Sequence, residues 1–365
     1  MNLSLRRLRN LDWVMLGLAL AISAIGILQI YSATQETRWG SAWWRQTLFV
    51  AAGLVGFWVI ASIDYHSQMG KSMLLYWVTI ILLVVVLSAG AKVFGSRRWI
   101  PLAFGFHFQV SEFGKLVIIL LVARYLTATK SDTLHGRELL KLAGLVAVPM
   151  LLVMRQPDLG TALTYLPVAG VGILLAGLRW RHIAIFGVLA VVVPVFAYHF
   201  VLKPYQRARV DSFIDPESDP HGSGYQVIQS KIAVGSGRLL GRGPAKGYQT
   251  RLQFLPVPHT DFILATFSEE HGFSGVVVIF VFYFLLLMQI VQNAQTALDR
   301  SGTFICMGVA ALLLFHILVN AGMVVGQMPI TGIPLPLMSY GGSSTLSTFL
   351  MLGLVNNVRL KRIVE

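Results

Sequence analysis

The residues best suited to acid–base chemistry are His259-Thr260-Asp261, which lead into an apolar run, and Glu269-Glu270 within that run. Burial at the edge of an apolar helix raises the pKa of a carboxyl group toward that of a general base, so Asp261 is the first candidate. On one continuous helix Glu269 lies about 80° around from Asp261 and Glu270 about 180°, so we expect Glu269 to be the companion. The competing interpretation is that Thr260 and Asp261 only cap a helix.

A second group combines Arg97-Arg98-Trp99 with Glu112 and Lys115. The planar guanidinium of Arg98 suits a phosphate, and Trp99 suits a membrane interface. Glu112 and Lys115 are three residues apart, so they face the same side of a helix and form an ion pair. The alternative is an anchoring tryptophan with snorkelling arginines and a self-neutralising pair.

Two further stretches carry weaker signals. Residues 155–161 place Pro157 and Asp158 where a helix starts, and a capped corner explains them equally well. In the polar stretch 203–264, residues 225–234 predict a short amphipathic helix on the membrane surface. The glycine-rich residues 235–247 carry three cations that suit a phosphate, and a flexible basic loop is the alternative.

Near the C-terminus, His316, Asn320 and Gln327 are spaced to share one helix stripe, which predicts an inward-facing polar face or a hydrogen-bonded helix seam. Residues 326–342 are rich in proline and glycine yet largely apolar, and Ser343 follows them. Irregular backbone at membrane depth is tolerated only inside protein or along a cavity, so we expect a re-entrant loop there. A purely structural role is the alternative for both.

The composition requires that these residues be held by membrane helices. Of 365 residues, 55% are hydrophobic and only 12% charged, and mean hydropathy is +0.69. A soluble domain has about twice that share of charge, so the composition excludes an ordinary soluble enzyme and a disordered chain. The single cysteine, Cys306, excludes a disulfide framework.

We expect one polytopic, all-α domain over residues 1–365, with a retained first span and no cleaved signal peptide. A span needs roughly 20 apolar residues. The ten predicted spans are 13–32, 44–63, 72–91, 110–127, 139–154, 159–177, 182–202, 265–291, 303–325 and 343–357.

The distribution of basic residues predicts that both termini are cytoplasmic. With that orientation, short inside segments hold 14 Lys and Arg residues and short outside segments hold 6, as the positive-inside rule requires. The net charge of +13 is therefore largely topological, and no nucleic-acid partner is expected. The motif-bearing loops then lie on the extracytoplasmic face, including the long loop 203–264 between the seventh and eighth spans.

Taken in order, these motifs resemble the SEDS family (shape, elongation, division and sporulation), bacterial membrane glycosyltransferases that polymerise peptidoglycan. The resemblance covers nearly the whole chain. The form Arg155-Gln156-Pro157-Asp158 is closer to the elongation and cell-shape branch than to the division branch. Val110 and Val257 depart from the family's usual proline and glutamate. The motifs that carry the resemblance are Arg98-Trp99, Gln109–Phe113 with Lys115, Gln156–Thr161, His259–Phe262 with Glu269-Glu270, and Pro329–Ser343.

The resemblance implies that lipid II is polymerised into β-1,4 glycan by an inverting single displacement, with Asp261 as the base. From charge and position on the outer side, we expect Arg98, helped by Lys115, at the departing pyrophosphate. We also expect substrate-binding roles for Glu112, Asp158, His259, Thr260, Glu269 and Ser343. No cofactor is expected, and a divalent metal is left open. The implied partners are a class B penicillin-binding protein and the elongation machinery. The implied location is the bacterial cytoplasmic membrane, with the active face outside.

Two alternatives remain at this level. A lipid II flippase needs polar groups through both leaflets, whereas the acids here cluster on the outer side, and inverted repeats are not evident. A scaffold that only recruits the penicillin-binding protein has no need of Asp261 and Glu269 at the membrane edge.

Overall fold

The computed structural model describes residues 10–35, 37, 39–93, 96–101, 107–129, 133–219, 222–252 and 254–364. Outside these ranges lie several basic residues that were counted in the orientation argument: Arg6, Arg7, Arg9, Arg38 and Lys130. The helices are α2 (Trp13–Thr34), α3 (Ala42–Ser62), α4 (Tyr65–Gly70), α5 (Ser72–Ala89), α6 (Val110–Ala128), α7 (Gly136–Arg155), α8 (Leu159–Leu163), α9 (Tyr165–Leu175), α10 (Trp180–Phe196), the π-helical turn η2 (Ala197–Val201), α11 (Pro204–Ile214), the 3-10 turn η3 (Pro216–Ser218), α12 (Ser223–Ser236), α13 (Tyr248–Arg251), α14 (Ile263–Gln295), α15 (Arg300–Val324) and α16 (Gly342–Val364).

Each of the ten predicted spans falls on a helix or a consecutive helix pair, and the sixth is broken at Thr164 between α8 and α9. Within the described residues, six helices are long and apolar enough to cross a membrane: α2, α3, α5, α10 with η2, α14 and α15. Helices α6 and α7 each carry at least three charged residues, which lowers their apolar character. The chain is therefore a multi-pass membrane protein, and ten crossings remain a prediction.

The all-α prediction needs one addition, because it placed no strand between the third and fourth predicted spans. Three short strands, β1 (Ala91–Val93), β2 (Ser96–Pro101) and β3 (His107–Phe108), form an antiparallel sheet in the order β1-β2-β3. Arg98 lies on β2, and the sheet ends just before Gln109, the residue that precedes α6.

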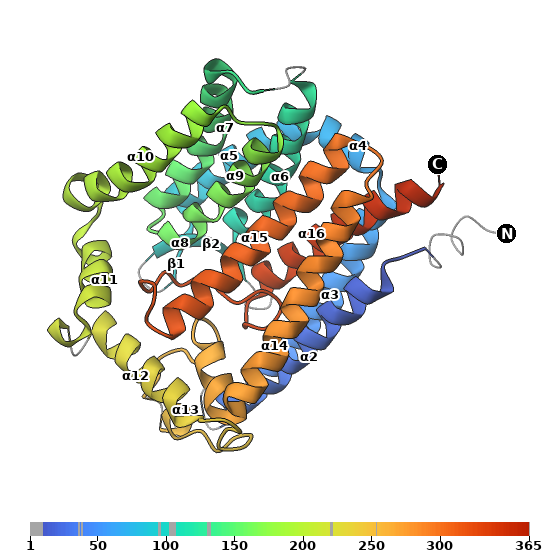
Figure 1. Ribbon diagram of the computed structural model, residues 1–365. Coiled ribbons are helices and arrows are strands. Elements are labelled where there is room, and N and C mark those ends of the chain that lie inside the picture. Colours follow the sequence, from blue (N-terminus) through green and yellow to red (C-terminus); the bar gives the residue numbers. More distant parts are fainter. Residues whose placement is uncertain are drawn as a thin grey trace.

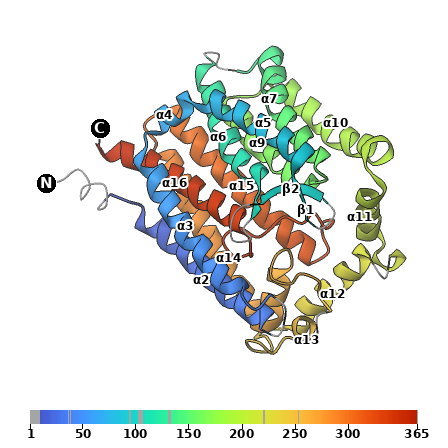
Figure 2. The same cartoon turned by 180° about the vertical axis from the view of Figure 1, so that it is seen from behind.

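The bundle is built around α15, which packs against α6, α9 and α14, while α3 runs along α16 and α2 along α14 (Figure 1). Close approach of α3 to α16 depends on small residues, as in other membrane helix pairs. A Cβ at Gly53 would lie 2.6 Å from the Phe349 ring, and one at Gly353 would lie 2.7 Å from the Phe57 carbonyl. Helix α10 buries none of its residues and stands outside the bundle (Figures 1 and 2).

The long stretch 203–264 is more ordered than the predicted loop, because it contains α11, α12 and α13. The helix expected over 225–234 is confirmed as part of α12, and its place on the membrane surface stays a prediction. Its buried face, which includes Val227, Ser230 and Ala233, packs against α14 and α15, and the Ser230 hydroxyl donates to the Val324 carbonyl at 2.8 Å.

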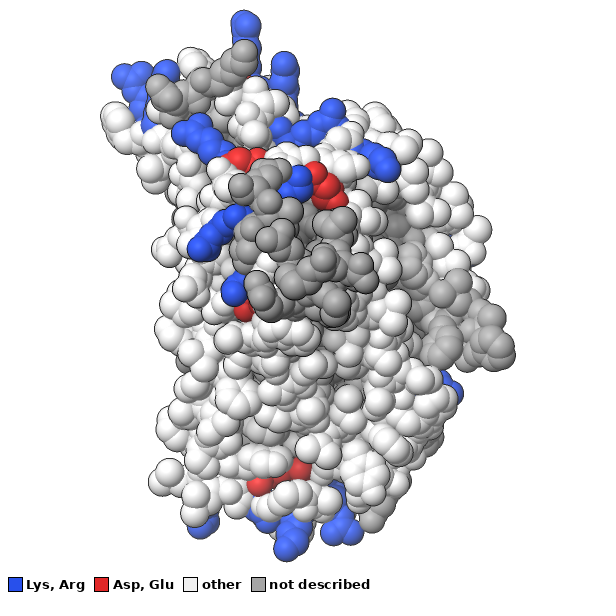
Figure 3. Space-filling model, turned by 90° about the vertical axis from the view of Figure 1, so that its right-hand side faces the viewer, with Lys and Arg blue, Asp and Glu red and all other residues white. Residues whose placement is uncertain are grey.

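On the face shown in Figure 3, charged side chains gather toward the two ends of the molecule, and the visible surface between them is largely uncharged. This is the distribution that a bilayer selects, because burying a charge in hydrocarbon is costly. Helix α4 and the C-terminus lie at one end, and α12 and α13 lie at the other (Figure 1).

Candidate functional site

Asp261 lies between α13 and α14, two residues before α14 begins at Ile263. Its backbone is fastened to the irregular segment 325–341, because the Asn320 amide donates to the carbonyls of Asp261 at 2.9 Å and Ile333 at 2.8 Å. The Ser339 hydroxyl donates to the Thr260 carbonyl at 2.7 Å. The Asp261 carboxylate faces Gly332, whose φ is +71° and whose added Cβ would lie 3.4 Å from Oδ2. Glycine thus supplies the left-handed backbone beside the carboxylate, whereas an added Cβ would only reach van der Waals contact with Oδ2.

The electrostatics of Asp261 suit a base. Burial raises its pKa above the ordinary value and outweighs Arg209, the Thr260 hydroxyl and Arg98, which lower the pKa; Asp158 raises it further. The residue as a whole has intermediate exposure to solvent. A carboxylate with a raised pKa binds a proton more readily than a free one.

Arg98 and Asp158, which were both predicted to be site residues, are neighbours in the structure. The Arg98 guanidinium donates to the Gln156 carbonyl at 3.1 Å and to the Pro157 carbonyl, and it lies 3.7 Å from the Asp158 carboxylate. Asp158 caps α8 through the Thr161 N–H, as its position predicted. The Arg98 side chain keeps 28% of its surface exposed, so part of the cation faces solvent.

Sequence reasoning missed Arg209, which has the largest effect of any charged residue on Asp261. It lies on α11 and its guanidinium donates to the Ile330 carbonyl at 3.2 Å. The same three charged residues also act on Tyr205. Burial and Asp158 raise the pKa of Tyr205, and Arg98 and Arg209 lower it. Nothing in the spacing of 203–214 distinguishes this arginine from an ordinary exposed one, since only the fold brings α11 to Asp261.

Glu112 and Lys115 form the predicted ion pair, at 2.7 Å, and both are buried, with exposures of 3% and 1%. Lys115 Nζ also lies 3.2 Å from His316 Nε2. Because an ammonium only donates, His316 accepts through Nε2 and donates through Nδ1 to the Pro334 carbonyl at 3.1 Å. The pair therefore supports the irregular segment from beneath. Lys115 Nζ already contacts two partners in this network, and its predicted help to the pyrophosphate stays a prediction.

Ser343 and His259 both make structural contacts. The Ser343 hydroxyl accepts from the Gln109 N–H at 2.9 Å and donates to the His107 carbonyl at 3.3 Å. The buried His259 ring lies between Trp39 and Tyr340, with centroid distances of 5.3 and 5.5 Å. Burial lowers the pKa of His259 to about 4, so its imidazole is neutral at pH 7. These contacts hold the walls of the site; substrate-binding roles for both residues stay predictions.

The expectation that Glu269 is the companion of Asp261 rested on a continuous helix, and that premise is wrong, because α14 starts after Asp261. Glu269 instead accepts hydrogen bonds from the Gln249 N–H at 2.9 Å and the Thr250 hydroxyl at 3.1 Å. Glu270 accepts from the Ser32 hydroxyl at 2.6 and 2.8 Å.

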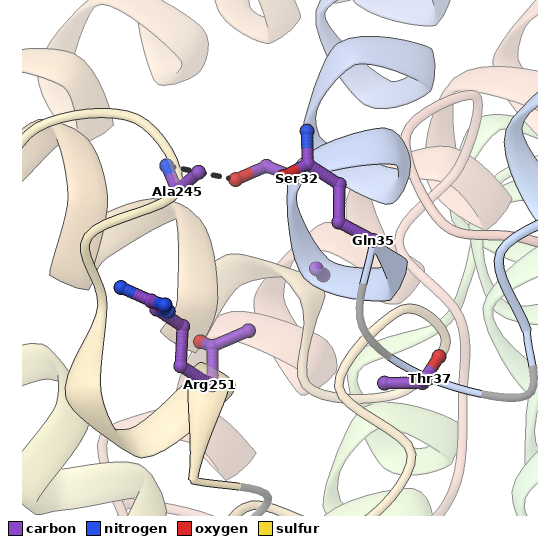
Figure 4. A pocket seen from close by; sticks show the side chains of 7 residues that line it. Ser32, Gln35, Thr37, Ala245 and Arg251 are labelled. Carbon is purple, nitrogen blue, oxygen red and sulfur yellow. Dashed lines mark hydrogen bonds between the residues drawn. The ribbon is translucent and has the colours of Figure 1, made fainter.

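These carboxylates lie beside a polar pocket of about 210 Å³, which is lined by Ser32, Ala33, Gln35, Thr37, Ala245, Thr250 and Arg251. Figure 4 shows the Ser32 hydroxyl accepting from the Ala245 N–H, at 3.0 Å, on one side of this pocket. Thr37 and Arg251 lie on its other sides. The two glutamates thus build the junction of α2, α13 and α14.

The glycine-rich stretch packs against α14 and does not form the free loop that was one of the two expectations. Helix α14 is kinked at Gly272, where φ is +65°. A Cβ at Gly237 would lie 1.9 Å from the Ser268 carbonyl, and one at Gly241 would lie 2.1 Å from the Glu270 carbonyl. The glycines are needed for this close approach, and phosphate binding by the neighbouring cations stays untested.

The expected stripe of His316, Asn320 and Gln327 is only partly correct. His316 and Asn320 face the irregular segment, as described above. Gln327 lies beyond the end of α15 at Val324 and is exposed, because Gly326 turns the chain with a φ of +72°. Within the part of the chain that the structure describes, no cluster of His, Cys, Asp and Glu residues suits a metal ion.

Comparison with known proteins places this architecture. Residues 9–363 match the FtsW/RodA/SpoVE family, described as cell cycle proteins. The peptidoglycan glycosyltransferase MrdB of Escherichia coli (strain K12) is 38% identical over 354 residues, which cover 97% of this chain and 94% of MrdB. Stage V sporulation protein E of Bacillus subtilis (strain 168) is 35% identical over 356 residues, with 95% and 96% covered.

Solved structures are similar to this chain over nearly its whole length. A chain from a study of how a peptidoglycan synthase complex coordinates polymerization and crosslinking has a TM-score of 0.82 at 34% identity and covers 97% of this chain and 99% of its own. The rod shape determining protein RodA of Thermus thermophilus has a TM-score of 0.72 at 29% identity, covering 96% and 97%. The chain therefore belongs to the FtsW/RodA/SpoVE family, the SEDS family that its motifs resemble.

Proposed function

We propose that this protein is a peptidoglycan glycosyltransferase of cell elongation, which polymerises lipid II with Asp261 as its general base. The single observation that carries the proposal is the environment of Asp261: a residue of intermediate exposure whose carboxyl pKa is raised by burial, with Arg209 and Arg98 close enough to act on it. The relatives named as peptidoglycan glycosyltransferases support the reaction class, and the likeness to a rod shape determining protein supports the role in elongation.

The reaction requires one base and stabilisation of one leaving group. Asp261 takes the proton of the GlcNAc C4 hydroxyl as that oxygen attacks C1 of the donor MurNAc. The bond between C1 and the pyrophosphate oxygen breaks, and undecaprenyl pyrophosphate leaves with the bonding electrons. A single displacement inverts C1 and needs no enzyme nucleophile, in contrast to a retaining glycosidase.

Arg209 and Arg98 are the residues suited to the leaving pyrophosphate. They are the two cations that act on Asp261, so they lie within coulombic range of the proposed reaction site, where a cation can stabilise the charge that develops on the pyrophosphate. Asp158 orients Arg98 from 3.7 Å, and the Gln109 amide donates to Asp158 at 3.0 Å, so the arginine is held before substrate arrives. Arg209 is held by the Ile330 carbonyl.

The proposed setting is the bacterial cytoplasmic membrane, with both termini inside and Asp261 on the outer face. The excess of Lys and Arg in the short segments predicted to be inside supports this orientation. Because a solved relative comes from a synthase complex that couples polymerization to crosslinking, we propose a crosslinking class B penicillin-binding protein as the partner of this chain.

Polymerisation of purified lipid II by the full-length protein, alone and with its cognate penicillin-binding protein, tests the proposal. Asp261→Asn keeps the side-chain size and removes the base. Glu217→Gln is the matched control, since Glu217 is an exposed carboxylate of the same outer region. Glycan strands from the wild type and the control, but not from Asp261→Asn, are expected. If folded wild-type protein with its partner makes no strands, transfer of labelled lipid II across vesicle membranes would support a flippase, and its absence a scaffold.

A further inference from the structure

A groove of about 700 Å³ lies between α5, α6 and α7, far from Asp261. Helix α6 begins beside the site, where the Gln109 side chain reaches Asp158, and it reaches the groove only in its last two turns. Figure 1 shows these helix ends on the side of the molecule away from α12 and α13. The groove therefore belongs to the other membrane leaflet from the proposed active site.

Apolar side chains form most of the groove wall. Tyr76 and Trp77 come from α5, Leu121 from α6, and Leu145 and Val148 from α7. A hydrocarbon chain is the natural occupant of such a wall in a bilayer, because it replaces another lipid contact at no cost of hydration.

Two cations and no carboxylate complete the described lining: Arg124 on α6 and Lys141 on α7. One terminal nitrogen of Arg124, Nη1, donates to the carbonyls of Gly70 at 2.9 Å and Met69 at 3.4 Å, which fixes the guanidinium. Its other N–H groups have no partner among the described residues, and neither does the Lys141 ammonium. Glu138, one turn before Lys141, is engaged by the His135 N–H at 2.8 Å.

A second groove, between α2 and α14, allows the charges of the two grooves to be compared. It has a similar volume of about 730 Å³, but Glu270 lines it and no Lys or Arg does among the described residues. The two grooves are thus similar in size but carry charges of opposite sign, and of the two only the groove at α6 and α7 complements an anion. Cationic grooves between spans on the cytoplasmic side are suited to lipid phosphates.

We propose that the groove between α5, α6 and α7 binds an anionic diacyl phospholipid of the cytoplasmic leaflet, with its phosphate between Arg124 and Lys141. One acyl chain runs over Gly144, where an added Cβ would meet no atom within 4 Å. The Tyr76 hydroxyl donates to the Leu145 carbonyl at 3.0 Å and fixes the distance between α5 and α7. The inference does not depend on the glycosyltransferase function.

Lipid titration of the full-length, delipidated protein, read by native mass spectrometry, tests the proposal with phosphatidylglycerol and phosphatidylcholine as probes. Arg124→Gln combined with Lys141→Gln removes the charge. Gly144→Leu fills the groove without removing charge, and leucine also favours the helix. Arg181→Gln combined with Arg300→Gln is the matched control, because both are exposed cations at the same end that do not line the groove.

The wild type is expected to bind phosphatidylglycerol in preference to phosphatidylcholine. The Arg124/Lys141 variant should bind phosphatidylglycerol about 30-fold more weakly, since each cation near a membrane surface contributes a factor of about five. Gly144→Leu should lose both lipids at unchanged melting temperature, and the control should bind as the wild type. Equal binding of the two lipids by the wild type, or wild-type binding by either groove variant, would overturn the proposal.

Discussion

The buried pair of Glu112 and Lys115 offers the sharpest energetic prediction. Both side chains are almost fully buried and 2.7 Å apart. Removal of one partner leaves an uncompensated charge in a low-dielectric interior, which costs about 3–5 kcal/mol, whereas replacement of both with neutral groups is often close to neutral. We therefore expect Glu112→Gln and Lys115→Met to be strongly destabilising alone and much less so together.

The effect is large enough to measure by thermal unfolding in detergent. With 365 residues and an unfolding entropy of about 2.1 cal/mol/K per residue, the loss corresponds to a fall in melting temperature of about 4–7 °C for each single variant. Ser347→Ala is the control, since it removes the hydrogen bonds from the Ser347 hydroxyl to Glu112 at 3.2 Å and to the Ser344 carbonyl at 3.0 Å but leaves both charges in place. That loss is worth about 1 kcal/mol, or roughly 1 °C. If the two single losses simply add in the double variant, the reasoning about a coupled buried pair is refuted.

Three further predictions concern the surroundings of the base. Arg209→Met removes the charge that most lowers the pKa of Asp261, so that pKa rises further; because the base must be deprotonated, the acid limb of the polymerisation rate against pH should move to higher pH, and Arg207→Met should leave it in place. Gly332→Ala forces a side chain into a left-handed backbone beside Asp261 Oδ2; we expect about 1 kcal/mol lower stability and about tenfold slower polymerisation, and an unchanged rate would contradict this. Val257 has a φ of +49°, which strains a β-branched residue, so Val257→Asn should raise the free energy of unfolding by about 1 kcal/mol; a decrease would show that the turn is not strained.

The helical framework was predictable because long apolar runs have few other structures available in a bilayer. The capping role of Asp158 and the pairing of Glu112 with Lys115 followed from local spacing alone. Such features depend on residues within one or two helical turns, so sequence separation is a fair guide to distance. The three short strands were missed because they carry no alternating pattern long enough to read.

The companions of Asp261 could not be predicted in the same way. The angular argument for Glu269 failed because it extended a helix through residues that precede Ile263. Arg209 acts on Asp261 only because α11 folds back over the irregular segment, where its side chain bonds the Ile330 carbonyl. No local rule relates residues 209 and 261, since their proximity depends on the packing of the whole outer region.

The most direct test of the account separates binding of lipid II from its polymerisation at Asp261. The Asp261→Asn variant should bind labelled lipid II with an affinity within a few-fold of the wild type, because Arg98 and Arg209 remain. It should polymerise at least a hundredfold more slowly, the loss expected when a positioned base is removed. Polymerisation by Asp261→Asn at the wild-type rate would contradict the assignment of Asp261 as the base.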